Sequence, residues 1–368
     1  MKIVQILPEM NAGGVELVTL ELASHLARAG HQSIVISNGG RLVDVLESSG
    51  ARHLAMPVHR KHLATLLQVA RLRRFFLEER PDIIHIASRA PGWVAWLAWR
   101  SLDPKIRPKF VSTVHGFYSV NRYSAIMTRG ERVIAVSESI RQYILKNYPK
   151  TPPKRIRVIP GGVDPTCFFP SFRPSSEWQQ QWQADHPQLA DQSLLLLPGR
   201  ITRLKGHADF INLIASLRSK GVPAHGLIAG DTHPKKRAYL DELHSLVDQL
   251  GIRDSITFLG HRKDIREVMA TSDLICALSQ QPESFGRTVL EAMALGKPVV
   301  GYDCGGVGEL LAALFPKGKV PLGDLALAGR LTEEILSQKP LPRRADAYTL
   351  ARTLQAHLDI YAEVLATP

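Results

Sequence analysis

The residues with the clearest chemical potential lie in the second half of the 368-residue chain. Arg200 follows an apolar run at residues 194–197, and Lys205-Gly206-His207 opens a helical pattern. Arginine offers a planar fork of donors and lysine a compact charge, and phosphate binding favours both. The spacing after a buried run therefore indicates a site for a phosphorylated ligand.

A second group of such residues begins at a loop carboxylate. Glu283 is followed by Phe285-Gly286-Arg287, and Glu291 falls early in the helix predicted to start there. The glycine permits close approach of a ligand, and the N–H groups of a helix start favour an anion such as a diphosphate. The carboxylates would accept hydrogen bonds from hydroxyl groups. Simple surface placement of two glutamates is the alternative, and the flanking Phe-Gly and the apolar helix face argue against it.

Two weaker candidates lie in the first half. Gly13 and Gly14 form a turn after the apolar run at residues 2–7, and the spacing is not GxGxxG, which argues against a nicotinamide cofactor. His115 follows the run at residues 110–114, where ligands bind in open α/β sheets. From the residues alone, a tight turn without function and a hydrogen-bonded structural histidine remain alternatives.

The elements that position these residues are short apolar runs alternating with helical patterns, which is typical of parallel strands joined by helices. Between residues 160 and 192 glycines, prolines and polar residues interrupt this alternation. We therefore predict two doubly wound α/β domains, 1–170 and 171–344, and a closing helix at 345–368. The expected strands are 2–7, 33–37, 83–86, 110–114, 133–136, 156–159, 194–197, 226–229, 256–259, 274–277 and 299–301.

Composition and charge limit the class of protein. Hydrophobic residues make up 45% and charged residues 22%, and the three cysteines form no CxxC pair. No run is long enough to cross a bilayer and the first apolar run is too short for a signal peptide, so we expect a cytoplasmic protein. Residues 1–170 carry 24 Lys+Arg against 12 Asp+Glu, whereas residues 171–368 carry 22 of each. This excess indicates an anionic partner (a membrane surface, a phosphorylated substrate or a nucleic acid), with a solvated surface as the alternative.

Taken together and in order, the motifs resemble the retaining family-four glycosyltransferases with a GT-B fold, over nearly the whole chain. A narrower likeness, to bacterial lipopolysaccharide-core transferases, lies in Ser88-Arg89-Ala90-Pro91-Gly92-Trp93 and Phe285-Gly286-Arg287-Thr288. The family segments are Gly13-Gly14-Val15-Glu16, Thr113-Val114-His115-Gly116, Ala135-Val136-Ser137-Glu138-Ser139, Val158-Ile159-Pro160-Gly161-Gly162-Val163-Asp164, Gly199-Arg200 with Lys205-Gly206, the pair Glu283/Glu291, and Gly296-Lys297-Pro298-Val299-Val300. Gly161 departs from the asparagine that many relatives have there.

The resemblance implies an architecture and a reaction. Two Rossmann-like domains would face each other across a cleft, and the helix at 345–368 would pack back on the first. The enzyme would move a hexose from a UDP- or GDP-sugar to a glycan or glycolipid acceptor, either phosphorylated or not, in lipopolysaccharide-core or cell-envelope synthesis. No Asp-x-Asp occurs in the sequence, so we expect a metal-independent reaction without a cofactor.

The resemblance also implies residue roles. Arg200 and Lys205 would hold the diphosphate, with backbone N–H groups near Phe285, Gly286 and Arg287 completing its cradle. Glu291 would bind the ribose and Glu283 the transferred sugar. Gly13 and Gly14 would approach the donor from the opposite wall, and His115 would lie beside the reacting sugar.

We expect the enzyme to act at the cytoplasmic face of the inner membrane. A helical pattern from residue 59 to residue 80 carries Arg71, Arg73 and Arg74, which we expect to contact anionic lipid. A second pattern carries Trp93, Trp96 and Trp99, interpreted as core positions of a crossover helix. The alternatives are a transferase with a small soluble acceptor, and a non-catalytic nucleotide-sugar or nucleic-acid binding protein. We see no nucleic-acid motif, and the sequence leaves the base, the sugar, the acceptor and the oligomeric state open.

Overall fold

The computed structural model describes residues 1–11, 13–58, 64–232 and 237–367. Its internal contacts divide the chain into two compact units. The first comprises Met1–Gly161 and Ala351–Pro368, and the second comprises Gly162–Leu350.

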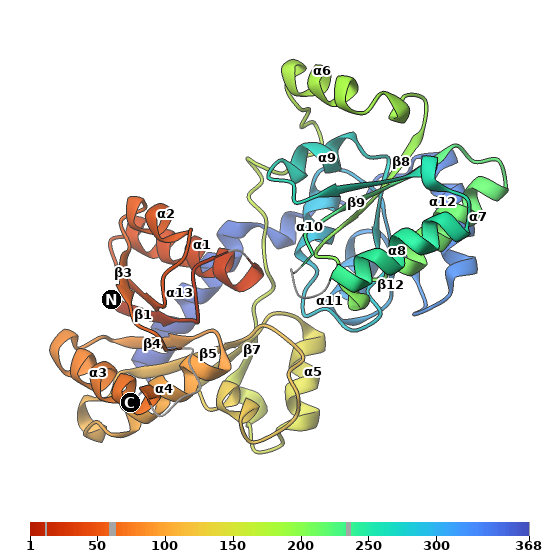
Figure 1. Ribbon diagram of the computed structural model, residues 1–368. Coiled ribbons are helices and arrows are strands. Elements are labelled where there is room, and N and C mark those ends of the chain that lie inside the picture. The colour runs from red at the N-terminus through yellow and green to blue at the C-terminus, as the bar shows by residue number, and fades with distance from the viewer. Residues whose placement is uncertain (12, 59–63, 233–236, 368) are drawn as a thin grey trace. The chain divides into compact units, whose positions relative to one another are not determined.

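The first unit is built on a seven-stranded sheet with the order β3-β2-β1-β4-β5-β6-β7, in which every pair of neighbours is parallel (Figure 1). Its strands are β1 (Lys2–Ile6), β2 (Gln32–Ser37), β3 (Arg52–Ala55), β4 (Ile83–Ile86), β5 (Lys109–Val114), β6 (Arg132–Ala135) and β7 (Ile156–Val158). Its helices are α1 (Gly14–Arg28), α2 (Val43–Ser48), α3 (Ala64–Glu79), α4 (Arg89–Arg100), α5 (Glu138–Asn147) and α13 (Leu350–Ala366), with short 3₁₀ helices η1 (Pro104–Ile106), η2 (Ser124–Thr128) and η3 (Pro153–Arg155).

The central strands are buried on both faces because helices cover the two sides of the sheet. Val4 and Ile84 belong to a cluster that includes residues of α3, α4 and α5. Val35 belongs to a separate cluster that includes Ala23 of α1 and Leu46 of α2. The sequence therefore reads as nearly continuous apolar runs in β1 and β4 rather than as alternation.

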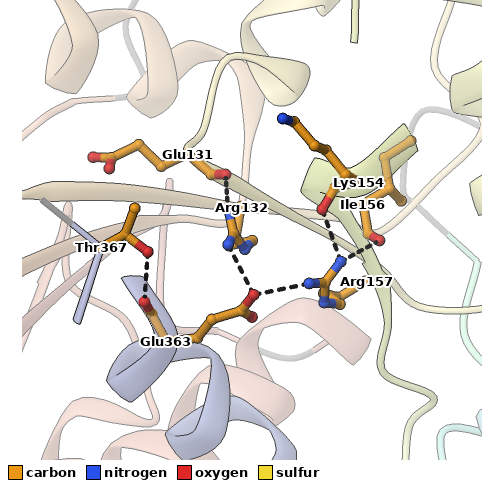
Figure 2. Close-up of polar contacts among 7 residues, drawn as sticks. All are labelled: Glu131, Arg132, Lys154, Ile156, Arg157, Glu363 and Thr367. Carbon is orange, nitrogen blue, oxygen red and sulfur yellow. Dashed lines mark hydrogen bonds and ion pairs between the residues drawn. The ribbon is translucent and has the colours of Figure 1, made fainter. Parts of the chain in front are cut away.

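The helix α13, at the blue end of the colour scale, lies among the red and orange elements of the first unit (Figure 1). Tyr361 is fully buried and its hydroxyl is 2.6 Å from Nδ1 of His85 on β4. The carboxylate of Glu363 accepts hydrogen bonds from Arg132 and Arg157, both at 2.8 Å (Figure 2). The hydrogen bond between Tyr361 and His85, together with the ion pairs of Glu363 with two arginines, thus fixes this helix to the strands.

The chain leaves the first unit before residue 170, the boundary expected from the sequence. Val163 donates a backbone hydrogen bond to Tyr348 and accepts one from Leu350, so the segment after Gly161 already packs with the second unit. The last helix begins at Leu350 rather than at 345, because a 3₁₀ turn (Asp346–Tyr348) precedes it.

The second unit is a six-stranded parallel sheet with the order β10-β9-β8-β11-β12-β13. Its strands are β8 (Ser193–Pro198), β9 (Ala224–Ala229), β10 (Ile256–Gly260), β11 (Leu274–Ala277), β12 (Val299–Tyr302) and β13 (Lys319–Val320). Its α-helices are α6 (Ser176–Asp185), α7 (His207–Ser219), α8 (Arg237–Gln249), α9 (Ile265–Thr271), α10 (Arg287–Ala294), α11 (Gly305–Leu314) and α12 (Leu325–Gln338). Its 3₁₀ helices are η4 (Pro187–Leu189), η5 (Arg203–Lys205), η7 (Arg253–Ser255), η8 (Pro316–Gly318) and η9 (Asp346–Tyr348).

Two edge strands, β3 and β13, were not expected from the sequence. Each is short and pairs on one side with a longer neighbour. The helical pattern expected from residue 59 is observed as α3 from Ala64, and residues 59–63 lie outside the described residues. Among the helices that the structure describes, none combines the length and the apolar composition that a bilayer crossing requires.

Candidate active site

The strand order of the second unit changes direction beside β8, with β9 and β10 on one side and β11 to β13 on the other. Ligands of open α/β sheets bind outside the carboxyl ends of the strands at such a reversal. The loops that leave β8 and β11 at this point contain Lys205 and Glu283. The sequence-predicted phosphate and carboxylate residues therefore lie at the expected place in the sheet.

Gly206 holds these two loops against each other. Its φ of 74° lies in the left-handed region, and a Cβ atom there would stand 1.9 Å from the carbonyl oxygen of Leu278. Nearby, the backbone N–H of Gln280 donates to the carbonyl of Leu204 at 2.8 Å. Only glycine fits such an approach, so this residue fixes where Lys205 can reach.

Lys205 and Glu283 form an ion pair across the two loops. The distance from Nζ to Oε1 is 2.8 Å, and each side chain is about a quarter exposed, at 28% and 25%. The hydroxyl of Ser279 also donates to the Glu283 carboxylate. An ammonium and an oriented carboxylate thus stand together where a phosphate and a hydroxyl could reach them.

The helix α10 begins beside this pair. Gly286, with a φ of 96°, turns the chain into the helix, and a Cβ atom on it would meet Val307 at 2.9 Å. One turn later the carboxylate of Glu291 accepts a hydrogen bond from Nε of Arg287 at 2.9 Å, which forms an ion pair, and the Glu291 side chain is 12% exposed. Phe285 is half-buried before the turn. The N–H groups of the first helical turn are available for an anion in such an arrangement.

A second helix start at this edge was missed in the sequence. Gly306, at the start of α11, donates its N–H to the carbonyl of Glu283 at 2.8 Å. Gly305 has a φ of 62°, and a Cβ atom on it would lie 2.4 Å from that same carbonyl oxygen. The signal was present as Cys304-Gly305-Gly306, a glycine pair between a strand and a helix like that at Gly13 and Gly14.

Asp209 supports the loop after β11. Its carboxylate accepts hydrogen bonds from the amide of Gln280 and from the hydroxyl of Tyr302. Burial and then the hydrogen bond to Asp209 raise the pKa of the Tyr302 hydroxyl, which therefore stays protonated. No pattern in the sequence connected these three residues, because they come from α7, the loop and β12.

Arg200 forms no ion pair with these carboxylates in the described chain. It follows β8, its side chain is exposed, and among the described residues it forms no side-chain hydrogen bond or ion pair. The guanidinium is thus placed in the loop that contains Lys205, without a protein partner in the described chain.

In the first unit the strand order changes direction between β1 and β4. Gly13 and Gly14 follow β1, and His115 follows β5, at the same edge of the sheet. A Cβ atom on Gly14 would meet nothing within 4 Å, so packing does not require a glycine there. Burial, and then the nearby His357 ring, lower the pKa of His115 to about 4, so its imidazole is neutral at pH 7.

Arg89, at the same edge, belongs to the segment that resembles lipopolysaccharide-core transferases, but the sequence did not predict it as a site residue. Its guanidinium carbon lies 4.7 Å from the ring centre of Tyr118 and 5.7 Å from that of Tyr123. Its Nη1 donates to the hydroxyl of Ser124 at 3.2 Å. The hydroxyl of Tyr118 in turn accepts the backbone N–H of His115 at 3.3 Å. These contacts hold a cation on two aromatic rings beside the histidine.

Known families match both units. Residues 12–166 match the family described as Glycosyltransferase Family 4, and residues 179–351 match Glycosyl transferases group 1. The N-acetyl-α-D-glucosaminyl L-malate synthase of Bacillus anthracis is 27% identical, with 82% of this chain and 78% of that protein covered.

Solved structures share the architecture of the whole chain. A glycosyltransferase from Rickettsia africae is 27% identical with a TM-score of 0.83, covering 100% of this chain and 99% of that one. Anabaena HepE in complex with UDP-glucose is 23% identical with a TM-score of 0.78, covering 100% and 99%. The predicted GT-B class, with two parallel-sheet Rossmann-like domains, is confirmed. The chain therefore belongs to the glycosyltransferases, with a Glycosyltransferase Family 4 domain followed by a Glycosyl transferases group 1 domain.

Proposed function

We propose that the protein is a retaining hexosyltransferase that uses a UDP- or GDP-activated hexose. The observation that carries this proposal is the ion pair of Lys205 and Glu283 at the strand reversal, next to the starts of α10 and α11. At one sheet edge a cation and helix starts can bind the diphosphate of a nucleotide-diphosphate sugar, and carboxylates can bind its hydroxyl groups.

Each donor group has a suitable partner in the second unit. Lys205, exposed Arg200 and the start of α10 would bind the diphosphate, because cations and the N–H groups of a first helical turn favour that charge. Glu283 would accept hydrogen bonds from hydroxyls of the sugar, and Glu291 from those of the ribose. Since Lys205 already contacts Glu283, the sugar and the phosphate next to it would lie on adjacent sides of this pair.

The transfer itself breaks the bond between the anomeric carbon and the β-phosphate oxygen. A bond from the acceptor oxygen to that carbon forms on the same face, and the hydroxyl proton passes to the departing phosphate. Lys205 and Arg200 would stabilise the charge that develops on the leaving diphosphate, in place of a metal ion. In the first unit, Gly13 and Gly14 would allow the donor to approach, and neutral His115 would hydrogen-bond to the reacting sugar.

The donor class draws support from a protein of the same fold. Anabaena HepE was solved with UDP-glucose, and it shares the fold over the full length of this chain. We extend this only to the class of donor, a nucleotide-diphosphate sugar.

For the acceptor, we favour a glycan or glycolipid, as in lipopolysaccharide-core synthesis. The excess of basic residues in the first half would suit a phosphorylated acceptor. A small anionic acceptor is the second candidate, because the Bacillus anthracis relative is named for L-malate. Both acceptors are anionic, so they differ in size and in attachment to a membrane rather than in charge.

We further propose that the protein works at the cytoplasmic face of the inner membrane as a peripheral protein. Arg71, Arg73 and Arg74 all have exposed side chains on α3. Arg74 pairs with Glu78 at 2.6 Å, which reduces the charge that this turn offers to a lipid. The neighbouring Phe76 is buried in the core and not available to a membrane.

The test begins with a thermal-shift screen over nucleoside diphosphates, since a bound ligand raises the unfolding temperature by mass action. The nucleotide that stabilises the protein then selects the sugar donors for an assay of diphosphate release, with short phosphorylated glycans and with malate or inositol phosphate as acceptors. Acceptor-dependent release supports the proposed transfer, and the anomeric configuration of the product tests retention. Stabilisation by no nucleotide and release with no acceptor would contradict it.

A further inference from the structure

A groove of about 590 Å³ lies in the first unit beside α4, η2 and the end of α5. Three segments line it: Trp96 and Trp99 in the second half of α4, residues 120–129 around η2, and residues 147–155 between α5 and β7. Its volume is in the range of small-ligand sites.

Most of the groove lies away from the candidate active site. Lys150 and Arg155 precede β7, at the amino ends of the parallel strands, whereas His115 follows the carboxyl end of β5. The helices α4 and α5 run from one sheet edge to the other, and the groove includes the ends that are farther from His115. The groove therefore extends from the loop after β5, which also contains Tyr118 and Tyr123, away from the strand-end site and towards the amino ends of the strands.

The groove is strongly basic. It contains four exposed cationic side chains, and within the part of the chain that the structure describes none of them forms an ion pair and no Asp or Glu lines the groove. Like charges gathered around one hollow repel each other, so an anion that enters lowers this repulsion. The four residues are Arg122, Arg129, Lys150 and Arg155.

The aromatic side of the groove is fixed in place. Nε1 of Trp99 donates to the carbonyl of Pro108 at 2.8 Å, and the ring of Trp96 meets that of Trp93 edge to face at 5.6 Å. The guanidinium of Arg129 lies over Trp96, with 4.5 Å from its carbon to the ring centre. Stacking orients the planar guanidinium and leaves its N–H edge free for hydrogen bonds, the geometry that suits a phosphate.

We propose that this groove is a second ligand site of the protein, which binds a phosphate-bearing group through Arg122, Arg129 and Lys150 against Trp96. The phosphate would come from the headgroup of an anionic lipid or from a soluble phosphorylated molecule, since both present the same group. The site does not depend on the donor chemistry of the second unit, so the two can be tested separately.

The first arm of the test measures binding of glycerol 3-phosphate by tryptophan fluorescence. The groove variant is R122A/R129A/K150A, and the matched control is R71A/R73A/R74A, which removes three arginines from α3 in the same unit. We expect the wild type and the control to bind alike and the groove variant at least tenfold more weakly, because each charge-assisted contact contributes to binding. The single variant R129K keeps the charge but loses the stacked plane, and we expect it to bind more weakly as well.

The second arm identifies the source of the phosphate by flotation with phosphatidylglycerol and phosphatidylcholine vesicles. Reduced flotation of the groove variant on phosphatidylglycerol would identify a lipid headgroup, and unchanged flotation would identify a soluble phosphorylated ligand. Equal binding of glycerol 3-phosphate by the wild type and the groove variant, or no binding by the wild type to either probe, would overturn the proposal. The thermal shift with nucleoside diphosphate reports the donor site in the same variants and should not change.

Discussion

Replacing Gly206 with alanine tests whether the contact between the loops after β8 and β11 builds the donor site. A Cβ atom on this residue would lie 1.9 Å from the Leu278 carbonyl oxygen, so the loops must separate by about 1.5 Å to restore an ordinary contact. The left-handed backbone itself costs an alanine roughly 1–2 kcal/mol. Overpacking adds roughly 1–3 kcal/mol, which gives an expected loss of unfolding free energy of about 2–5 kcal/mol.

Gly221 provides a matched control. It follows α7 with a φ of 82°, close to the 74° of Gly206, but a Cβ atom on it would meet nothing within 4 Å. Gly221→Ala should therefore lose only the backbone contribution, about 1–2 kcal/mol. The difference between the two variants isolates the clash with Leu278.

The assay combines urea denaturation with titration of the nucleoside diphosphate that stabilises the wild type. Gly206→Ala should bind this nucleotide at least tenfold more weakly, because the loop that carries Lys205 moves, whereas Gly221→Ala should bind it normally. Equal stability and equal nucleotide affinity in the two variants would refute the reasoning.

Three further predictions concern the first unit, the effect of pH and the metal requirement. Tyr361→Phe removes a hydrogen-bond partner of buried His85, so it should lower the free energy of unfolding by about 1–3 kcal/mol in urea denaturation, and an unchanged midpoint would contradict the role of α13. Burial lowers the pKa of His207 and of His225 from 6.5 to about 4, so protons bind more readily to the unfolded chain than to the folded one. The free energy of unfolding should therefore be highest above pH 6.5 and should fall towards pH 4. At pH 5 the expected loss is about 2 kcal/mol per histidine. Identical denaturation at pH 7.5 and pH 5 would be incompatible with these shifts. Because Lys205 and Arg200 are expected to replace a cation, EDTA should leave turnover within about twofold, and loss of activity that a divalent ion restores would contradict this.

Reversal of the charge of three arginines on α3 tests the proposed contact with the membrane. Arg71, Arg73 and Arg74 changed to glutamate should reduce flotation with anionic vesicles, since each cation near such a surface contributes about 1 kcal/mol. Binding by the wild type should weaken as salt rises. Equal flotation of the wild type with neutral and anionic vesicles would leave α3 without this role.

Much of the fold was predictable because buried parallel strands leave a strong pattern. The runs at β1, β4 and β5 are mostly apolar and buried on both faces, and the strands coincide with them to within a residue or two. The edge strand β3 was missed because Arg52-His53-Leu54-Ala55 is partly exposed and contains no run of β-branched or aromatic residues of the kind that indicates a strand. The strand β13 has only two residues, too few for any pattern to indicate a strand.

The sequence indicated the positions of residues that lie close together along the chain, but it did not indicate contacts across the sheet. Spacing along one helix predicted that Glu291 would lie near the start of α10, and its partner Arg287 is four residues away. The ion pair of Lys205 with Glu283 and the support from Asp209 depend on the order of β8, β11 and β12, which the sequence does not state. For the same reason the groove at Trp96 was missed, because Lys150 comes from a different segment that only the fold places beside that helix.

The measurement that tests the central claim most directly compares binding of a nucleoside diphosphate and the matching monophosphate by calorimetry. If Lys205 contacts the β-phosphate, the wild type should prefer the diphosphate by about ten- to a hundredfold, as expected for a charge-assisted contact of roughly 1.5–3 kcal/mol. Lys205→Ala should lose most of this preference, whereas Glu291→Ala should weaken both ligands equally because its proposed partner is the ribose. An unchanged preference in Lys205→Ala, or a preference lost only in Glu291→Ala, would contradict the assignment of the donor site.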